Sequence, residues 1–303
     1  MLFKRILVTG GSGQVGTAIQ ALAPPAVSIH APPSAQLDVR DGRSVAAAFA
    51  DFHPDAVINA AAYTRVDQAE DEPEAAFAVN AEGARHIAKA CAANGCPLLH
   101  LSTDYVFDGA KRGAYAESDP TAPINAYGRS KLAGEQAVAE VLDAHLILRV
   151  AWVFSATGAN FVKTMLNLAG RDELRVVNDQ RGAPTAARSI AAALWRILER
   201  MASTPRFGLY HLASEPPTTW HGFAAAIFAG LAERKGEGAL PKLVPIPTAD
   251  YPTRAARPQN SLLSGARLHR HYGIGPADWR GELGIVLGTL LGDRRGDELA
   301  ELA

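Results

Sequence analysis

The sequence predicts an α/β fold built on a doubly wound parallel sheet, and two observations carry that prediction. Short apolar, β-branched runs alternate with helix-forming stretches from residue 4 to residue 150, which is the pattern of successive βαβ units. The first apolar run is followed at once by a glycine-rich turn and a helix, as in Rossmann-like domains that bind dinucleotides. We therefore expect a Rossmann-like NAD(P)-binding domain over 1–150, completed by parts of 178–212, and a smaller C-terminal substrate-binding lobe formed mainly by 151–303.

The composition is that of an ordinary soluble globular protein. Of the 303 residues, 48% are hydrophobic and 20% charged, close to the usual proportions. The formal net charge of -1 offers no positive surface to nucleic acid or to an anionic membrane. Every apolar run is shorter than a membrane span, and a strand-like run by residue 6 leaves no room for a signal peptide. We expect a cytoplasmic protein with neither nucleic acid nor membrane as a partner.

The metal-binding residue types show no spacing typical of a metal site. Cys91 and Cys96 lie in one apolar stretch, which favours small buried hydrophobes over a disulfide or a metal site. The nine histidines include the pair His269 and His271, which we interpret as surface residues. We expect no metal.

The first strand and the turn after it form the dinucleotide signature. Lys4 to Thr9 is short, apolar and β-branched, as expected for a buried parallel strand. It is followed by Gly10-Gly-Ser-Gly13-Gln-Val-Gly16, with a Gly-x-x-Gly-x-x-Gly spacing. Glycines permit a tight turn and close approach of a pyrophosphate, and the following helix presents free N–H groups and the positive end of its dipole.

The second strand decides the cofactor only in part. Val27 to His30 runs into Ala31-Pro-Pro-Ser34, without the carboxylate that binds the adenosine ribose in many NAD-dependent proteins. A 2′-phosphate would meet no repulsion there, although no arginine follows immediately to hold it. NADPH and NADH both stay open, with a slight preference for NADPH. Asp38, in Leu37-Asp-Val39, either contacts the adenine or caps a turn.

Two further strands end in small or hydroxyl residues, where ligands bind in open α/β sheets. The strand that starts at Ala56 runs through Asn59 into three alanines, which leave space for a cofactor. After a predicted helix over 75–94, the strand Pro97 to Leu101 leads into Ser102 and Thr103. We expect the chemistry at these strand ends.

Tyr127 and Lys131 are the strongest candidates for acid–base chemistry. They stand four residues apart in Asn125-Ala-Tyr-Gly-Arg-Ser-Lys131, so a helix places them on one face, one turn apart. An ammonium beside a phenol favours the phenolate and lowers the phenol's pKa from its usual ~10. Such a tyrosine exchanges a proton with a sugar or steroid oxygen near neutral pH. Alone, however, the spacing also arises by chance.

Beyond a strand over 146–150, the alternation becomes less regular. The stretch Asn178 to Thr185 is turn-rich and precedes a predicted helix over 189–201 and a strand over 208–212. Residues 236–261 hold many prolines and glycines, together with Arg254, Arg257 and Asn260. This polar, loop-rich part is typical of a substrate-binding lobe.

Five sequence blocks, in colinear order over nearly the whole chain, carry a family resemblance. They are Ala61-Ala-Tyr-Thr-Arg-Val-Asp-Gln-Ala-Glu70, Ser102-Thr-Asp-Tyr-Val-Phe-Asp-Gly109, Tyr127-Gly-Arg-Ser-Lys-Leu-Ala-Gly-Glu135, Asn178-Asp-Gln-Arg-Gly-Ala-Pro-Thr185 and Arg257-Pro-Gln-Asn-Ser261. With these blocks the chain resembles the dTDP-4-dehydrorhamnose reductases, within the extended short-chain dehydrogenase/reductase family. The resemblance implies reduction of the C4 ketone of dTDP-4-dehydro-L-rhamnose with NADPH or NADH, in dTDP-rhamnose biosynthesis.

The resemblance also implies residue roles. Tyr127 is expected to protonate the C4 oxygen as hydride arrives, and Lys131 to lower the pKa of Tyr127 and to bind the nicotinamide ribose. Thr103, with Ser102 beside it, is expected to hydrogen-bond the ketone oxygen. The implied cofactor-binding residues are Gly10, Gly13, Gln14, Val15, Gly16, Asp38, Val39, Ala60, Ala61, Ala62, Tyr63, Ser102, Tyr127 and Lys131. The implied substrate contacts are Thr103, Tyr105, Trp152, Asn178, Arg257 and Asn260.

Structural roles stay open for some of these residues. Ser102 and Thr103 fit a strand cap, Trp152 fits core packing, and Arg257 fits a solvated loop. Some members of the family bind a metal through glutamates at a dimer contact, but the positions that match are Ala18 and Arg188. We therefore expect no such metal site, and a monomer or a weak homodimer.

Three other functions fit the sequence less well, and the missing glutamate argues against the first of them, dehydration. A sugar-nucleotide 4,6-dehydratase needs an Asp-Glu pair after the threonine, and here Tyr105 follows Asp104. A non-catalytic regulatory subunit, of the kind that serves methionine adenosyltransferase, does not need an intact set of Thr103, Tyr127 and Lys131. A reductase of another 4-keto sugar nucleotide is excluded least well.

Overall fold

A parallel sheet forms the centre of the computed structural model, which describes residues 3–236 and 240–292. Six strands of the described chain lie in the order β10-β5-β4-β3-β1-β2, and all neighbouring pairs are parallel. They are β1 (Arg5–Thr9), β2 (Ser28–His30), β3 (Ala56–Asn59), β4 (Leu98–Thr103), β5 (His145–Val150) and β10 (Gly208–His211). The predicted fold class, a doubly wound α/β sheet, is confirmed.

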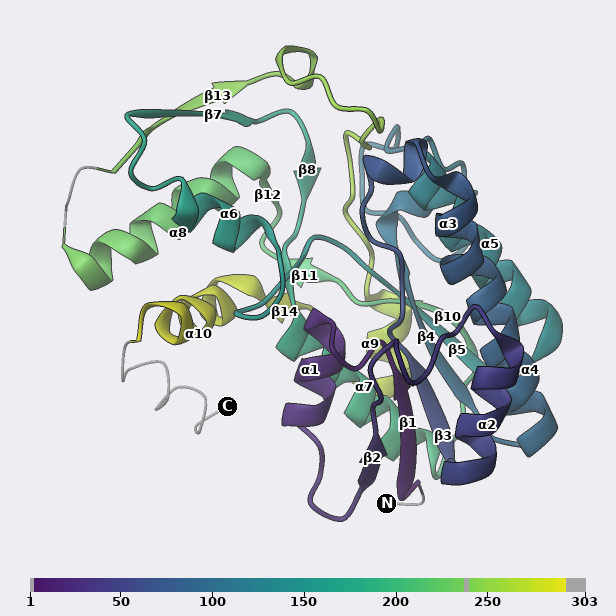
Figure 1. Ribbon diagram of the computed structural model, residues 1–303. Coiled ribbons are helices and arrows are strands. Elements are labelled where there is room, and N and C mark those ends of the chain that lie inside the picture. The colour runs from purple at the N-terminus through teal and green to yellow at the C-terminus, as the bar shows by residue number, and fades with distance from the viewer. Residues whose placement is uncertain (1–2, 237–239, 293–303) are drawn as a thin grey trace.

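Helices cover both faces of the sheet (Figure 1). One face carries α1 (Gln14–Ala21), α7 (Ala187–Met201) and α9 (Ala266–Tyr272), and the other α2 (Gly42–Phe52), α4 (Gly83–Asn94) and α5 (Ala126–Val141). Alternate strand residues point to opposite faces, so Ile6 and Val8 pack with α7, whereas Leu7 packs with α4. Burial on both faces explains why these strands are continuous apolar runs.

Two elements differ from the predicted ones by more than their end residues. Strand β4 continues through Ser102 and Thr103, beyond the predicted end at Leu101, because these residues pair with Arg149 and Val150 of β5. The predicted helix over 75–94 comprises α3 (Pro73–Phe77), a π-helical turn η2 (Ala78–Glu82) and α4. Single 3-10 turns lie at η1 (Gln68–Glu70), η3 (Asp104–Val106) and η4 (Thr248–Asp250).

A second, smaller lobe lies beside the carboxyl ends of the strands (Figure 1). Its parallel pair β7 (Glu173–Val177) and β13 (Lys242–Ile246) packs with α6 (Phe161–Asn167), α8 (Trp220–Lys235) and α10 (Trp279–Leu291). Phe154, Phe223 and Trp279 are at most 1% exposed in its core. Short two-residue strands join the lobe to the sheet half: β6 (Val153–Phe154) with β9 (Thr185–Ala186), β8 (Arg181–Gly182) with β12 (Thr218–Thr219), and β11 (Ser214–Glu215) with β14 (Ala277–Asp278).

The cysteines, the helices and the metal-binding residue types can be compared with the sequence analysis. Cys91 and Cys96 are buried in the core beneath α4, as predicted. Within 3–236 and 240–292, no helix combines the length and the apolar character that a membrane crossing requires. The same residues contain no cluster of histidine, cysteine and carboxylate side chains arranged for a metal ion.

Candidate active site

The glycine-rich turn after β1 is held by backbone contacts closer than any side chain allows. A Cβ on Gly16 would lie 2.2 Å from the carbonyl oxygen of Gly10, and one on Gly10 would lie 2.6 Å from the backbone of Ala60. Gly10 also has a φ of 71°, in the left-handed region that favours glycine. The turn lies where β1 has β2 on one side and β3 on the other, the switch point at which such sheets bind ligands.

This turn fits the pyrophosphate of a dinucleotide. Gly13 precedes α1, and no side chain of the described residues caps the first N–H groups of this helix. These N–H groups can therefore bind an anion. Val15 packs against the core of this face. The Gln14 side chain also makes protein contacts, because its Oε1 accepts hydrogen bonds from Ser155 and Asn160, both at 3.0 Å. Gln14 therefore ties the start of α1 to the segment after β6.

Asn59 and Asn80 shape the cofactor channel after β3, and the sequence analysis assigned a role to neither. Asn59 Oδ1 accepts from Thr9 Oγ1 at 2.6 Å and from the N–H of Ala61 at 3.1 Å. Asn80 Oδ1 accepts from the N–H of Tyr63 at 2.8 Å, and its Nδ2 donates to Ser130 at 2.9 Å. These amides hold the segment from Ala60 through Ala62 to Tyr63, which was predicted to line the channel, while the Tyr63 hydroxyl donates to Glu72.

Asp38 lies in a turn. Its Oδ1 accepts from the N–H of Arg40 at 3.0 Å, and both carboxylate oxygens bind the Arg40 guanidinium. These hydrogen bonds with Arg40 hold the pKa of Asp38 below its usual value. Val39 packs under Gly83 of α4, where an added Cβ would lie 2.8 Å from it. Arg40 is thus the partner of Asp38 in this turn.

The structure brings Thr103, Tyr127 and Lys131 together where β4 meets α5. Asn125 caps α5 by accepting from the N–H of Gly128 at 2.7 Å, which sets Tyr127 and Lys131 in its first two turns. Lys131 is 3% exposed and donates to the carbonyl oxygen of Leu101 at 2.7 Å. Burial lowers the pKa of Lys131 to about 8.

The predicted lowering of the Tyr127 pKa is wrong for this structure. Burial raises the pKa of Tyr127 to about 12, a hydrogen bond with Thr103 opposes the rise, and the nearby Asp104 adds to it. The Lys131 ammonium is bound to the Leu101 carbonyl, and the phenol is withdrawn from water. Tyr127 is therefore a protonated phenol at neutral pH.

Thr103 serves as a cap and also faces the tyrosine. Its Oγ1 accepts from the N–H of Tyr105 at 3.2 Å, which caps η3, and donates to Asp104 Oδ1 at 3.1 Å. Asp104, whose role the sequence analysis missed, is 2% exposed, and its Oδ2 has no hydrogen-bond partner among the described residues. Burial raises the pKa of Asp104 to about 6.

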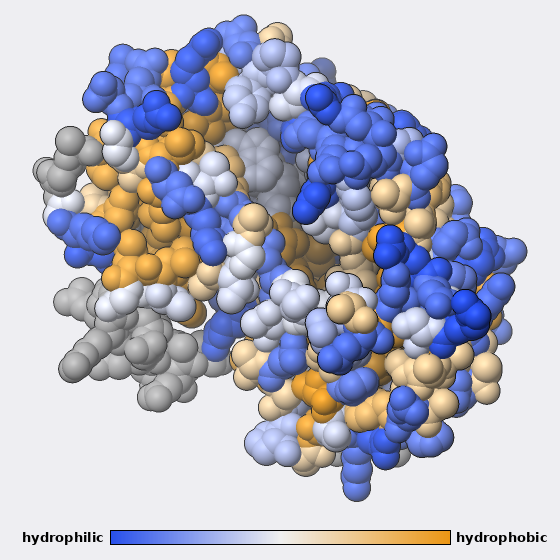
Figure 2. Space-filling view, viewed as in Figure 1, coloured by the Kyte–Doolittle hydropathy of each residue, from blue (hydrophilic) through white to orange (hydrophobic). Residues whose placement is uncertain are grey.

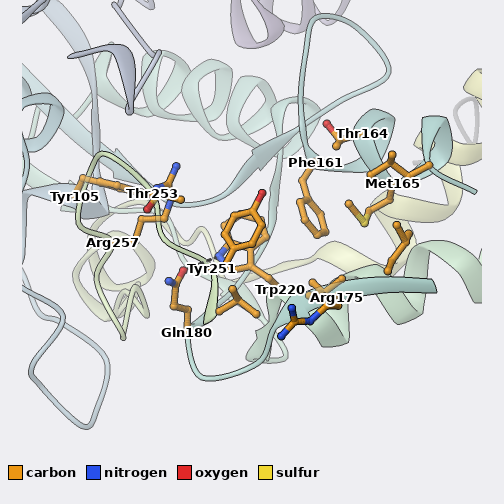
Figure 3. A pocket seen from close by; sticks show the side chains of 14 residues that line it. Tyr105, Phe161, Thr164, Met165, Arg175, Gln180, Trp220, Tyr251, Thr253 and Arg257 are labelled. Carbon is orange, nitrogen blue, oxygen red and sulfur yellow. Dashed lines mark hydrogen bonds between the residues drawn. The ribbon is translucent and has the colours of Figure 1, made fainter. Parts of the chain in front are cut away.

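A cavity of about 500 Å³ leads from this group into the second lobe. Figure 2 shows the surface hollowed between the lobe and the sheet half, and Figure 3 shows Tyr105 and Arg257 at one end of the pocket, with Phe161 and Met165 at the other. The Tyr105 ring lies 5.5 Å from that of Tyr127, edge to face. The lining residues are Tyr105, Phe161, Thr164, Met165, Leu168, Leu174, Arg175, Val176, Val177, Gln180, Trp220, Tyr251, Thr253 and Arg257.

Of the predicted substrate contacts, Tyr105 and Arg257 line this cavity. Arg257 is not a solvated loop residue, because it forms two hydrogen bonds with Asp67, at 3.1 and 2.6 Å. These hydrogen bonds hold the pKa of Asp67 below its usual value. The sequence analysis missed Asp67, and it missed the aromatic rings of Phe161, Trp220 and Tyr251 because they come from segments far apart in the chain.

Trp152, Asn178 and Asn260 are not among the residues that line the cavity. The Trp152 ring stacks on Trp220 with centroids 3.7 Å apart and is 9% exposed. Asn178 accepts from Thr219, the cap of α8, at 2.7 Å. Asn260 donates to the carbonyl oxygens of Lys111 and Gly113. The first two side chains thus support Trp220 from behind, while Asn260 ties two loops together.

The chain as a whole has counterparts among known proteins. The model of the family described as RmlD substrate binding domain matches residues 4–291. The chain belongs to this family. Relatives in it include the dTDP-4-dehydrorhamnose reductase of Burkholderia thailandensis, 46% identical, with 95% of this chain and 99% of that protein covered. The Escherichia coli K12 protein of the same name is 42% identical, with 91% and 94% covered.

Solved structures agree with this membership of the RmlD family. A Bacillus anthracis dTDP-4-dehydrorhamnose reductase, solved in complex with NADP, superposes with a TM-score of 0.86 at 34% identity, covering 94% of this chain and 98% of that one. A Thermus thermophilus UDP-glucose 4-epimerase, at a TM-score of 0.75 and 21% identity over 95% and 99%, shares the fold. The predictions of the family and of an oxidoreductase are confirmed.

Proposed function

We propose that this chain reduces the C4 ketone of dTDP-4-dehydro-L-rhamnose to dTDP-L-rhamnose with NADPH or NADH. The observation that carries the proposal is the continuity of the site. The glycine turn at the end of β1, the group of Thr103, Tyr127 and Lys131, and the cavity that starts at Tyr105 follow one another across the carboxyl ends of the strands. The relatives with 40–46% identity bear the name of this activity.

The glycine turn fits the pyrophosphate of a nicotinamide dinucleotide, because close backbone contacts fix the turn and α1 begins after Gly13 without a side-chain cap on its N–H groups. In this proposal Gly10, Gly13 and Gly16 hold the pyrophosphate, and Lys131 holds the nicotinamide ribose. The bound cofactor supplies a hydride to the ketone carbon. The segment after β2 carries no carboxylate, so a 2′-phosphate is tolerated, and we expect NADPH to be the slightly better cofactor.

Tyr127 supplies the proton in this proposal. A pKa of about 12 keeps its phenol protonated, so its Oη–H is ready to donate to the sugar's C4 oxygen as negative charge develops there. The O–H bond of the phenol breaks, a new O–H bond forms on the sugar, and a phenolate is left. Thr103 Oγ1 lies beside this oxygen as a second hydrogen-bond partner, and the buried Lys131 cation favours the phenolate.

The cavity accounts for a nucleotide attached to the sugar. We place the sugar at Tyr105, beside Tyr127, and the diphosphate between Arg257 and Arg175, since guanidinium groups bind phosphate oxygens in pairs. The base then lies among the rings of Phe161, Trp220 and Tyr251. Trp152 and Asn178 act by holding Trp220 and its helix in place.

The division of labour and the assembly are part of the proposal. Residues 1–150, with parts of 178–212, bind the cofactor, and the remainder binds mainly the sugar nucleotide. Arg188, which matches one metal-binding glutamate of other members, pairs with Glu282 at 3.5 Å. Because Arg188 stands in place of that glutamate, we propose that assembly does not depend on a metal. We further propose a cytoplasmic enzyme that is a monomer or a weak homodimer.

The test is oxidation of NADPH or NADH, with dTDP-4-dehydro-L-rhamnose generated in situ. Loss of reduced-nicotinamide absorbance that depends on the keto sugar, with dTDP-L-rhamnose as the product, is the expected result. Binding of NADPH or NADH without its oxidation in the presence of the keto sugar would contradict the proposal. If NADPH or NADH is oxidised only with a different 4-keto sugar nucleotide, the proposed ketone reduction stands and the proposed substrate is wrong.

A further inference from the structure

Beside Lys131 lies a buried ion pair, Glu135 with Arg149, to which the mechanism assigns no role. Glu135 stands one turn after Lys131 on α5 and ends the block that begins at Tyr127. Lys131, Glu135 and Arg149 are 3%, 5% and 2% exposed. Charges buried to this degree are costly unless they are paired, so the cluster requires a physical explanation.

The carboxylate of Glu135 accepts three hydrogen bonds from two residues. Its Oε1 accepts from Ser102 at 2.5 Å and from Arg149 Nε at 2.8 Å, and its Oε2 accepts from Arg149 Nη2 at 2.6 Å. The Arg149 guanidinium is itself held 4.9 Å above the Phe107 ring and 3.4 Å from His211 Nε2. Strands β4, β5 and β10 thus hold one carboxylate against α5.

Glu135 is also the acidic neighbour that favours a charged Lys131. Burial disfavours the ammonium form, and the Glu135 charge opposes that effect. The Lys131 ammonium donates to the Leu101 carbonyl, one residue before Ser102 on β4. The lysine and the carboxylate are therefore anchored to adjacent residues of the same strand.

Other titratable groups around α5 have partners of their own or shifted pKa values. His100 on β4 has a pKa far below its usual value through burial and through Lys131 itself. Asp104 and Tyr105 in η3 both have raised pKa values through burial. On η2 and α4, Glu82 pairs with Arg85 at the surface, and Glu74 on α3 is exposed.

We propose that Glu135 is a positioning residue that keeps the Lys131 ammonium charged and in place one turn after Tyr127 on α5, with Arg149 and Ser102 holding its carboxylate in place. The inference rests on the proposed function, because that function is what gives Lys131 a role beside Tyr127 in the reaction. Ser102, predicted to contact the cofactor, acts here through Glu135. The ion pair therefore tunes the lysine as well as joining helix to sheet.

Two substitutions separate this role from a merely structural one. Both Glu135→Gln and Arg149→Met break the same ion pair, so loss of rigidity affects both variants alike. The two variants differ in charge. E135Q removes the negative neighbour of Lys131, whereas R149M keeps the Glu135 carboxylate and removes the cation that neutralises it. The pKa of Lys131 is expected to fall by about one unit in E135Q and to rise in R149M.

The readout is the pH titration of the Lys131 side chain by NMR on the full chain with 13C-labelled lysine, assigned with Lys131→Arg. Glu140→Gln, an exposed acid on the same helix that pairs with Arg85 at 3.0 Å, is the control and is expected to leave the titration unchanged. Shifts of the same sign in E135Q and R149M, or no shift in either, would overturn the proposal. The double variant E135Q/R149M leaves no buried charge unmatched and serves where a single variant does not fold. Its Lys131 pKa is expected to fall, and an unchanged value counts against the proposal.

A second readout connects the cluster to turnover. The alkaline limb of kcat/KM against pH reports on groups of the free enzyme, and it is expected to move to lower pH in E135Q and to higher pH in R149M. If the wild-type protein does not reduce the keto sugar, the proposed function fails. The NMR titration still decides the role of Glu135, so the two failures are distinguishable.

Discussion

The two halves of the active site are held in place by different kinds of contact. On the cofactor side the backbone itself forms the site, and a Cβ on Gly16 would come within 2.2 Å of a carbonyl oxygen. On the substrate side, side chains from separate segments form the cavity, including Phe161 of α6, Trp220 of α8 and Arg257 of a late loop. A side chain added at Gly10 or Gly16 therefore disturbs the backbone itself, whereas a change at the cavity alters a single lining side chain.

The largest effect is expected where the two halves meet. Tyr127→Phe removes the proton donor and keeps the ring against Tyr105, so kcat is expected to fall by about 10²–10⁴-fold. Titration with NADPH should give an affinity close to that of the wild type. Tyr210→Phe, which changes a buried phenol in the core of the sheet, is the control and should keep its turnover. Wild-type turnover in Tyr127→Phe would mean that another group donates the proton.

Gly16→Ala tests the cofactor half alone. The new methyl group has to displace the Gly10 carbonyl, and overpacking of this kind costs about 1–3 kcal/mol of unfolding free energy. NADPH affinity is expected to fall at least about tenfold with it. Gly170→Ala is the control, because a Cβ there meets nothing within 4 Å. Denaturant unfolding and cofactor titration give both numbers, and equal behaviour of the two variants would refute the backbone cradle.

Asp104→Asn tests a charge buried between the halves. The folded-state pKa of about 6 lies above that of an unfolded aspartate, so the folded protein loses stability as pH rises from about 4 to about 6 and bears the full cost above that range. The amide carries no such cost. We expect the variant to be more stable than the wild type by up to about 3 kcal/mol near pH 7, with the gain vanishing near pH 4.

Urea unfolding at both pH values measures this gain, with Asp51→Asn on the exposed face of α2 as the control. A variant less stable than the wild type near pH 7 would show that the carboxylate is better accommodated than its burial implies. A confirmed gain would mean that the wild-type residue is kept at a cost in stability.

Arg257→Lys tests the substrate half, with the smallest expected effect. A lysine keeps the charge but loses the paired hydrogen bonds to Asp67 and to a phosphate. We expect KM for the sugar nucleotide to rise about tenfold, or about 1.4 kcal/mol, with NADPH affinity unchanged. Arg254→Lys, in the same loop and paired with Asp71 outside the cavity, should change neither. If both variants raise KM alike, the effect belongs to the loop and not to Arg257.

The same contrast explains which features could be predicted from sequence. The glycine spacing and the four-residue step from Tyr127 to Lys131 are local patterns whose geometry a turn or a helix determines. They predicted the sheet, the turn and the helix that carries both Tyr127 and Lys131. The continuation of β4 through Thr103 depends on its pairing with β5, and no local pattern marks it.

The substrate side depends on contacts between segments far apart in the chain. Trp152 was expected to contact the substrate, yet its ring stacks on Trp220, and the Asn260 amide donates to two loop carbonyls. Spacing alone also predicted the wrong direction for the Tyr127 pKa. Burial of the phenol outweighs its position on the helix, and burial is a tertiary property.

The most direct test of the account is a crystal structure with NADP and dTDP-L-rhamnose bound together. The account predicts the sugar's C4 oxygen within hydrogen-bond distance of Tyr127 Oη and Thr103 Oγ1, the diphosphate against Arg257 and Arg175, and the base among Phe161, Trp220 and Tyr251. A sugar nucleotide bound outside this cavity, or one whose C4 oxygen faces away from Tyr127, would contradict it.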